Sequence, residues 1–447
     1  MSRPRRANPP HNAGLVPPSF AATASLSRRS FLRSAALGGA ILGAPGLLAA
    51  CGGDDGGGGS GGDTVTFGMN ESGDIPPADR LRAMAAAFEK KSGLKVTRNE
   101  VSHNTFQENI NTYLQGNPDD VFTWFAGYRM NFFAEQGVIR DVSDVYPIDG
   151  INDSFKEAAT ASDGKQYFVP KDYYPWAVFY RKSVFEKNGF EVPTNRDDLL
   201  ALCKEMEGKG ITPFAFADKD GWPAMGTFDI LNMRLNGFDF HMKLMAGEEA
   251  WDSDEVKGVF ETWRELLPYH QTDALGRTWQ EGAEAIGSGE AGMMMFGTFI
   301  VDAIPDSEDD LDFFTYPELD PAIGADALDA PIDGFCMAAE PDNEEGAKEF
   351  IAFLGTAEAA DAANATGVPF IAANENASKE SYSDLQRKSA EVVGAASNIA
   401  QFLDRDTRPD FAATVMIPSL QTFLRNPDDI DGLTSSIQQQ KESIFVD

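Results

Sequence analysis

The amino-acid sequence predicts an α/β fold, in which parallel strands alternate with helices that cover the sheet. From residue 64 onward, short apolar runs typical of strands alternate with longer segments whose apolar residues recur every three or four positions. The opening order is therefore β-α-β-α-β, and strands joined by single helices pair in parallel through right-handed crossovers. The 42% hydrophobic and 11% aromatic content of the 447 residues is sufficient for a large core.

The expected elements follow one another with the spacing of such crossover units. The helix expected at 79–91 has one apolar face and ends before Gly93, a residue suited to a helix C-terminus. The complete set is strands at 64–68, 94–101, 120–126, 211–217, 291–296, 311–316 and 332–338, with helices at 79–91, from 104, around 199–206 and around 256–267, and a mainly helical last hundred residues.

Residues 1–50 have the order of an export signal. Twin arginines at 28–29 precede an apolar run at 35–50, which is shorter than the roughly 20 residues that span a bilayer. The arginines followed by Phe31 and Leu32 resemble the signals of the bacterial Tat exporter. We therefore expect a Tat-type signal peptide and an exported mature protein.

The segment Leu48-Ala49-Ala50-Cys51 resembles the bacterial lipobox, in which the cysteine receives a diacylglycerol and becomes the first mature residue. The stretch at 52–62 is almost all glycine, cannot bury a core and predicts a flexible tether. We expect residues 51–63 to hold the protein at the cell membrane through the lipid on Cys51, on its extracellular or periplasmic side.

The mature part is strongly acidic. The chain has a formal net charge of −33, and the six arginines of residues 1–50 leave the remainder at −39. Such a surface repels phosphate backbones and anionic lipid headgroups, so nucleic-acid binding is not expected. Cys203 and Cys336 lie in apolar patterns, which favour buried thiols over a disulfide. The four histidines lack metal-ligand spacing, and no metal or other cofactor is expected.

Several short blocks of residues between 117 and 297 occur in an order that is typical of one protein family. One is Gly164-Lys165-Gln166-Tyr167-Phe168-Val169-Pro170, and another runs from Gly287 to Gly297. The whole set comprises 117–127, 136–138, 164–170, 174–182, 185–189, 211–214, 222–224, 235–238 and 287–297.

Together these blocks resemble family 1 of the extracellular solute-binding proteins of carbohydrate ABC importers. Residues 222–224 and 235–238 are most similar to the branch that binds α-glucosides, glucose or trehalose. The resemblance implies a two-lobed, periplasmic-binding-protein-like fold of type II, with a helix-flanked sheet in each lobe and several hinge segments. It implies a non-enzymatic, monomeric receptor that delivers a sugar to the ABC transporter permease. The implied lobes are 64–175 plus 315–356 (lobe 1) and 176–314 plus 357–447 (lobe 2).

A sugar site needs flat aromatic rings for the C–H faces of the ligand and polar groups for its hydroxyls. Trp124, Trp176 and Trp222 stand at strand ends or in loops, where ligands bind at the edge of an α/β sheet. Trp251 and Trp263 lie in or beside a helical pattern and are expected to pack. The polar candidates are Asn70, Glu71, His103, Asn104, Lys171, Asp172 and Asp333.

These candidates have ordinary structural alternatives. Each tryptophan could be a core residue, Asn104 could cap a helix, and Asp333 could form a turn before a glycine. Lys171 and Asp172 could form a local ion pair of little energetic consequence. Three more residues stay open as cleft residues: Trp279, Arg408 and Asp410.

Two other functions fit part of the pattern. A secreted glycoside hydrolase needs two carboxylates about 5 to 10 Å apart across a sugar cleft. The 70 acidic residues make such a pair unavoidable by chance, and no motif selects one. Tyr173 and Tyr174 resemble the adjacent tyrosines of ferric-ion receptors, but no second group of metal ligands accompanies them. A sugar receptor is therefore favoured.

Overall fold

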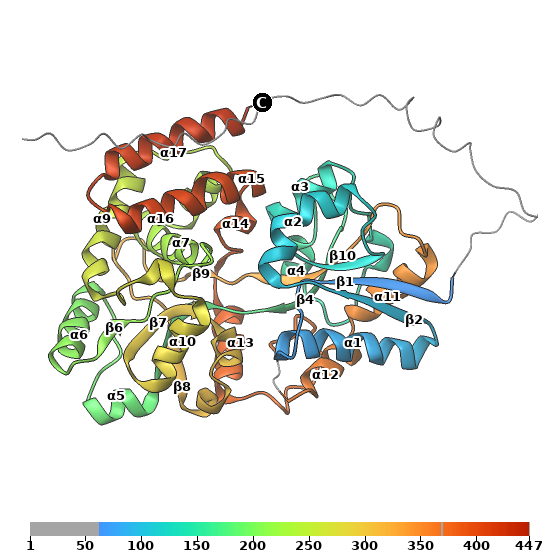
Figure 1. Ribbon diagram of the computed structural model, residues 1–447, viewed down its shortest axis with the longest axis horizontal. Helices are drawn as coiled ribbons and strands as arrows, with labels where there is room; N and C mark the ends of the chain where they lie inside the picture. Colours follow the sequence, from blue (N-terminus) through green and yellow to red (C-terminus); the bar gives the residue numbers. More distant parts are fainter. Residues whose placement is uncertain (1–61, 368–369, 447) are drawn as a thin grey trace, which may run out of the picture. The chain divides into compact units, whose positions relative to one another are not determined.

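The computed structural model describes residues 62–367 and 370–446. The predicted signal peptide, Cys51 and the tether as far as residue 61 lie outside these ranges, so the predictions made for them stay predictions. Within the described ranges, two separate sheets form the framework of the molecule (Figure 1). None of the helices in these ranges has the length and apolar composition needed to cross a bilayer.

The first sheet has the strand order β2-β1-β3-β10-β4. Strand β1 (Thr64–Met69) pairs in parallel with β2 (Lys95–Glu100) and β3 (Val121–Phe125), which confirms the predicted opening unit. Strand β10 (Ile332–Met337) lies antiparallel to both β3 and β4 (Val169–Tyr173). Because β10 comes from a distant part of the chain, no local pattern indicated its direction or its place in the sheet.

Helices of the first lobe pack on this sheet through aromatic side chains. The Phe350 ring centre lies 5.1 Å from that of Phe67 in β1 and 4.8 Å from that of Phe88. The helix that carries Phe88 ends at Gly93, whose φ of 81° is a left-handed conformation suited to glycine. The helices of this lobe are α1 (Pro76–Ser92), α2 (His103–Gln115), α3 (Tyr128–Glu135), α4 (Asp153–Ala158), α11 (Glu344–Leu354) and α12 (Ala357–Asn364).

The second sheet has the order β6-β7-β5-β8. Strand β5 (Trp176–Arg181) lies antiparallel to β7 (Ala291–Gly297) and β8 (Leu311–Phe314), and β6 (Thr212–Phe214) is parallel to β7. Its helices are α5 (Lys182–Asn188), α6 (Arg196–Gly208), α7 (Pro223–Asn236), α8 (Phe238–Met245), α9 (Asp254–Leu266), α10 (Trp279–Ser288), α13 (Asp384–Ala395), α14 (Leu403–Asp406), α15 (Pro409–Phe411), α16 (Ile417–Arg425) and α17 (Ile430–Ile444).

The chain passes between the two sheets more than once. It crosses at 174–175 and returns along 315–331, where β9 (Ala327–Asp329) pairs in parallel with β11 (Asn398–Ala400). Beyond residue 357, where the second lobe was expected to resume, α12 packs against α1, and residues as far as Ala377 belong to the core of the first sheet.

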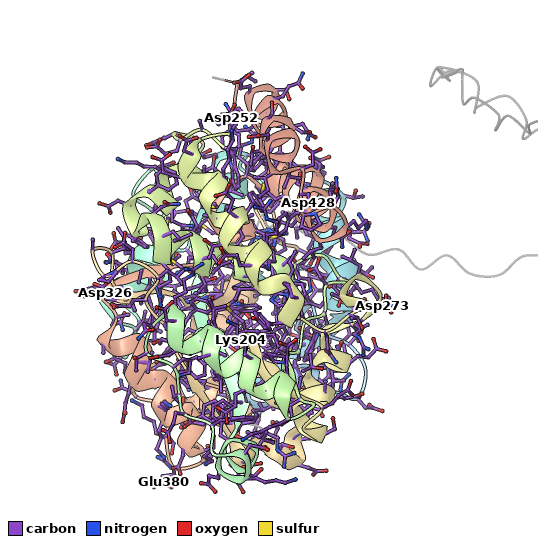
Figure 2. All side chains as sticks on the ribbon, turned by 90° about the vertical axis from the view of Figure 1, so that its left-hand side faces the viewer. Lys204, Asp252, Asp273, Asp326, Glu380 and Asp428 are labelled. Atoms are coloured by element: carbon purple, nitrogen blue, oxygen red, sulfur yellow. The ribbon has the colours of Figure 1, made fainter. Side chains whose placement is uncertain are left out.

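Many charged side chains lie at the surface, whereas both thiols in the described residues are buried. Cys203 and Cys336 are buried free thiols, as the sequence predicted. Burial raises the pKa of the Cys203 thiol to about 12, so this group stays unreactive. The charged residues labelled in Figure 2 are all exposed: Lys204, Asp252, Asp273, Asp326, Glu380 and Asp428.

Candidate functional site

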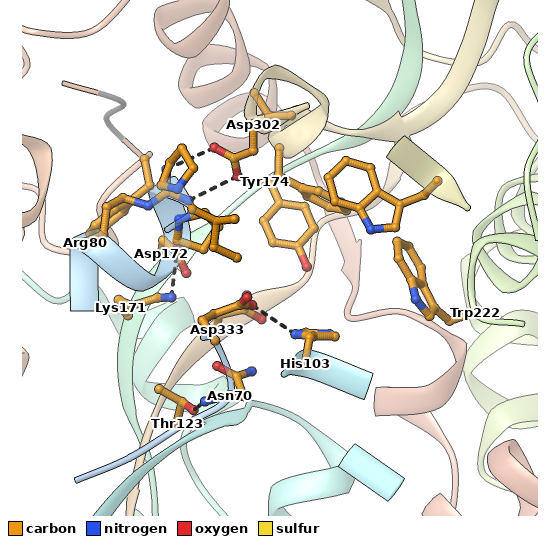
Figure 3. Close-up of a pocket in the computed structure, with 18 of the residues that line it drawn as sticks. Asn70, Arg80, His103, Thr123, Lys171, Asp172, Tyr174, Trp222, Asp302 and Asp333 are labelled. Atoms are coloured by element: carbon orange, nitrogen blue, oxygen red, sulfur yellow. Dashed lines mark hydrogen bonds and ion pairs between the residues drawn. The ribbon is translucent and has the colours of Figure 1, made fainter. Parts of the chain in front are cut away.

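A cavity of about 530 Å³ is lined by residues from both sheets and their connecting segments (Figure 3). This volume lies in the range of roughly 300 to 1,000 Å³ that is typical of small-molecule sites. The structure brings together all ten predicted residues, each of which lines this cavity: Asn70, Glu71, His103, Asn104, Trp124, Lys171, Asp172, Trp176, Trp222 and Asp333.

Several contacts hold Arg405 in the wall of the cavity. Its guanidinium donates to Asp333 Oδ1 at 2.7 Å and to the Tyr174 hydroxyl at 3.1 Å. It also lies 4.1 Å from the ring centre of Phe125. The residue is only 7% exposed, so these contacts fix the guanidinium and the Asp333 carboxylate in one arrangement.

One carboxylate oxygen of Asp172 has no hydrogen-bond donor among the described residues. Its Oδ2 lies 3.5 Å from Lys171 Nζ, whereas its Oδ1 is buried without a hydrogen-bond partner among the described residues. Burial raises the pKa of Asp172 to about 6, with the Lys171 charge opposing this shift and Asp333 adding to it. Because an unpaired buried oxygen is costly, a donor supplied by a ligand would stabilise this position.

A second cluster of polar residues lies around the end of β1 and beside β3. The backbone N–H of Asn70 donates to Thr123 Oγ1 at 2.9 Å, which fixes the chain where β1 ends. His103 Nδ1 lies 3.1 Å from Glu71 Oε1, and its Nε2 lies 2.6 Å from Gln107 Nε2. The Glu71–His103 pair is partly exposed and contributes little to stability by itself, so its side chains are available to a ligand.

Two of the predicted tryptophans belong mainly to the core behind the cavity. Trp124 and Trp176 are only 1% and 2% exposed. Trp124 packs 5.5 Å from the Phe133 ring centre, and a Cβ at Gly226 would lie 2.3 Å from the Trp176 ring. Both line the cavity, but most of their surface supports its walls. As expected, Trp251 and Trp263 are fully buried.

Accessible aromatic surface comes from the second lobe. Trp222 and Trp279 are partly exposed and line the cavity together with Phe299. The Trp222 and Phe299 ring centres are 6.1 Å apart, and those of Trp279 and Phe299 are 5.6 Å apart. Figure 3 shows Trp222 on the opposite side of the cavity from Lys171 and Arg80. A flat ligand would thus have a polar wall on one side and aromatic rings on the other.

Besides the Arg405–Asp333 pair, further side-chain contacts bridge the lobes beside the cavity. Arg80 in α1 donates to both oxygens of Asp302 at 3.3 Å (Figure 3), and Asp302 ends the 3₁₀ turn η4 (Thr298–Asp302). Asn104 Nδ2 donates to Asp220 Oδ1 at 3.0 Å. Asn104 lies inside α2, whose N-cap position is Ser102, so it is not the helix cap, and its side chain connects the first lobe to the second. Both contacts favour a closed arrangement of the lobes.

Asp302→Asn is expected to weaken ligand affinity without unfolding the protein. The amide keeps the shape but loses the charge that pairs with Arg80, so the closed state is less populated. The expected loss is about 1 to 2 kcal/mol, or roughly five- to thirty-fold in Kd, measured by isothermal titration. Asp306→Asn, an equal charge change at an exposed position, is the matched control. Equal affinities for the two variants would contradict this role.

Sequence reasoning missed several residues of the cavity. Arg80, Asp302 and Arg405 line it, but each lies in an ordinary charged stretch, and only the tertiary fold brings it there. Phe402 also lines the cavity in a left-handed conformation (φ 119°), with its ring centre 5.0 Å from that of Trp176. Two open candidates lie outside the lining and pair with each other at 2.8 and 3.0 Å: Arg408 and Asp410.

The tyrosine pair is not arranged for a metal. The Tyr174 hydroxyl accepts a hydrogen bond from Arg405, while the Tyr173 ring packs 5.1 Å from Phe155. Burial raises the pKa of Tyr174 well above its usual value, which disfavours the phenolate that would bind ferric ion. The described part of the chain contains no cluster of three His, Cys, Asp or Glu residues suited to a metal ion.

Comparisons of the sequence with known proteins find extracellular and periplasmic binding proteins. The family model of the bacterial extracellular solute-binding proteins matches residues 83–390. An uncharacterised ABC transporter extracellular-binding protein of Pyrococcus horikoshii is 28% identical over 290 residues, which are 62% of this chain and 64% of that protein. A probable sugar-binding periplasmic protein of Brucella melitensis is 28% identical over 38% of this chain and 42% of that protein. The chain thus spans less than two thirds of the length of these relatives.

One solved structure has a higher sequence identity to this chain than the relatives named above. The bacterial solute receptor AcbH, described as having an exclusive substrate preference for β-D-galactopyranose, is 43% identical in sequence. It superimposes with a TM-score of 0.83 over 86% of this chain and 99% of the receptor.

Proposed function

Because this chain belongs to the bacterial extracellular solute-binding proteins, we propose that it is the sugar-binding component of an ABC importer. Proteins of this family bind solutes and are not catalysts, which agrees with the expectation of a receptor rather than a hydrolase. The observation that carries the proposal is the cavity itself, which has buried ion pairs on one wall and accessible tryptophans on the other. Sugars combine hydroxyl rims with apolar faces and need both kinds of wall.

The ligand we propose is a hexopyranose, with galactose as the first candidate. The 43% identity with a receptor described as preferring β-D-galactopyranose supports this choice. α-Glucosides, glucose and trehalose, which the blocks at 222–224 and 235–238 favour, are the second group of candidates. Asp172, Asp333 and Arg405 would distinguish these sugars, because a buried group left without its hydroxyl partner is strongly disfavoured.

Trp222→Ala is expected to weaken sugar binding by about 1 to 2 kcal/mol, or roughly five- to thirty-fold in Kd, because it removes an accessible stacking surface. Trp222→Phe keeps an aromatic face and should retain most of the affinity. Isothermal titration of both variants with the sugar that the parent protein binds measures this difference. If alanine binds as tightly as phenylalanine, Trp222 is only a packing residue.

Isothermal titration of the mature protein tests the proposed function. Galactose should give saturable heat, and glucose, trehalose, maltose and sucrose should bind more weakly or not at all. If none of these five sugars, nor longer oligosaccharides, gives heat, the protein is not the proposed receptor.

The N-terminal segment indicates where the protein acts. We propose that residues 1–50 are cleaved off and that the mature protein is anchored to the membrane by a lipid on Cys51. The tether at 51–63 would let the loaded receptor reach its permease while it diffuses in the plane of the membrane. Cys51→Ala is expected to prevent lipid addition and the cleavage that follows it, while the sugar affinity of the purified protein stays unchanged. Mass spectrometry of the parent protein should find a lipid on an N-terminal Cys51, and a parent protein without this lipid would contradict the anchor.

A further inference from the structure

The described residues that line the cavity carry more negative than positive groups. Six carboxyl side chains stand against three lysine and arginine side chains. The acidic group is Glu71, Asp172, Asp220, Asp302, Asp333 and Asp404, and the basic group is Arg80, Lys171 and Arg405.

Each of the three cations is already engaged by a carboxylate. Arg80 pairs with Asp302, Lys171 pairs with Asp172, and Arg405 pairs with Asp333. An anionic ligand that took one of these cations would leave the former partner without its counter-charge. Since both members of the Arg80 and Lys171 pairs are largely buried, such a loss is strongly unfavourable.

Asp172 adds an independent requirement. This side chain is 7% exposed, and its Oδ1 has no hydrogen-bond partner among the described residues. A ligand group beside this carboxylate is favoured if it donates a hydrogen bond, as a sugar hydroxyl does. At neutral pH a ligand carboxylate is ionised and a phosphate monoester is mostly dianionic, so either group would be repelled.

We infer that the site selects its sugar by charge as well as by shape, so that neutral hexoses bind and the matching uronates and sugar phosphates are rejected. This inference rests on the proposed function, because it concerns the same cavity. It goes further in naming the chemical class of ligand and the carboxylates that exclude the others.

The test compares ligands that differ only in charge. At pH 7.5, the parent protein is titrated with galactose, with galacturonate and with galacturonamide, a neutral molecule of nearly the same shape as galacturonate. Galacturonamide should bind at least 100-fold more tightly than galacturonate. Asp172→Asn, which keeps the size of the side chain and removes its charge, should reduce this ratio at least ten-fold.

The possible outcomes distinguish a failure of the charge selection from a failure of the proposed receptor function. If galactose binds and the acid and the amide have similar affinities in the parent protein, the charge selection is wrong and the receptor function stands. The same conclusion follows if the ratio is unchanged in Asp172→Asn. If no neutral sugar binds at all, the proposed function fails and the inference falls with it. Circular dichroism and thermal unfolding of the variant check that it is folded.

Discussion

Arg405→Met is expected to abolish measurable sugar binding and to destabilise the protein. The substitution leaves the Asp333 carboxylate and the Tyr174 hydroxyl without the donor that now binds both. Breaking a buried ion pair by removing one partner costs about 3 to 5 kcal/mol in the free energy of unfolding. Urea unfolding measures the stability, and isothermal titration should show an affinity at least 100-fold lower.

A double variant separates the two effects of this change. Arg405→Met combined with Asp333→Asn leaves no unpaired charge at the pair, so most of the lost stability should return. Sugar binding should not return, because the double variant lacks both the guanidinium and the carboxylate that we expect to contact the sugar. A single variant that loses less than about 1 kcal/mol, below the range for a broken buried pair, would contradict the role given to this pair.

Acidification from pH 8.5 to 6.5 is expected to stabilise the protein by roughly 2 to 4 kcal/mol, because several buried carboxyl groups hold protons more tightly in the folded state. Burial raises the pKa of Asp218 and of Asp406 to about 7. It also raises the pKa of Asp229 and Asp329 well above the ordinary value. The unfolded chain has carboxyl pKa values near 4, so the folded state binds more protons in this window and stability falls as the pH rises.

Below pH 6.5 two histidines oppose this trend. Burial lowers the pKa of His241 and His270 to about 3, so the unfolded state takes up protons that the folded state does not. Stability should therefore level off between pH 6.5 and 5. Urea unfolding at pH 5.0, 6.5, 7.5 and 8.5 measures the profile. Asp218→Asn should be more stable than the parent at pH 8.5 and should show a smaller slope. A parent protein whose stability increases toward pH 8.5 would contradict these pKa directions.

The sequence predicted the fold better than the way its parts join. The α/β fold of the periplasmic-binding-protein type is confirmed by the two helix-flanked sheets and by the 43% identical receptor structure. The repeating apolar pattern is local, and it identifies strands and helices one at a time. The antiparallel insertion of β10 and the packing of α12 on α1 depend on contacts between distant segments, so no local pattern could indicate them.

The candidate site was predictable where its residues follow strands. Asn70 follows β1, Asp172 is the last residue but one of β4, and Asp333 is the second residue of β10. Neighbouring strand ends must meet at one edge of a sheet. Arg405 could not be found in this way, because it lies in the short helix α14 and reaches the cavity only through the last crossing of the chain. For Trp124 and Trp176 the sequence left core packing and ligand contact equally open, and the structure places most of their surface in the core.

A crystal structure of the mature protein grown with saturating galactose tests the central claim most directly. The account predicts one sugar in the cavity between the lobes, with hydroxyls bonded to Asp172, Asp333 or Arg405 and an apolar face on Trp222 or Trp279. A cavity that stays without sugar, or a sugar held by residues of only one lobe, would contradict it.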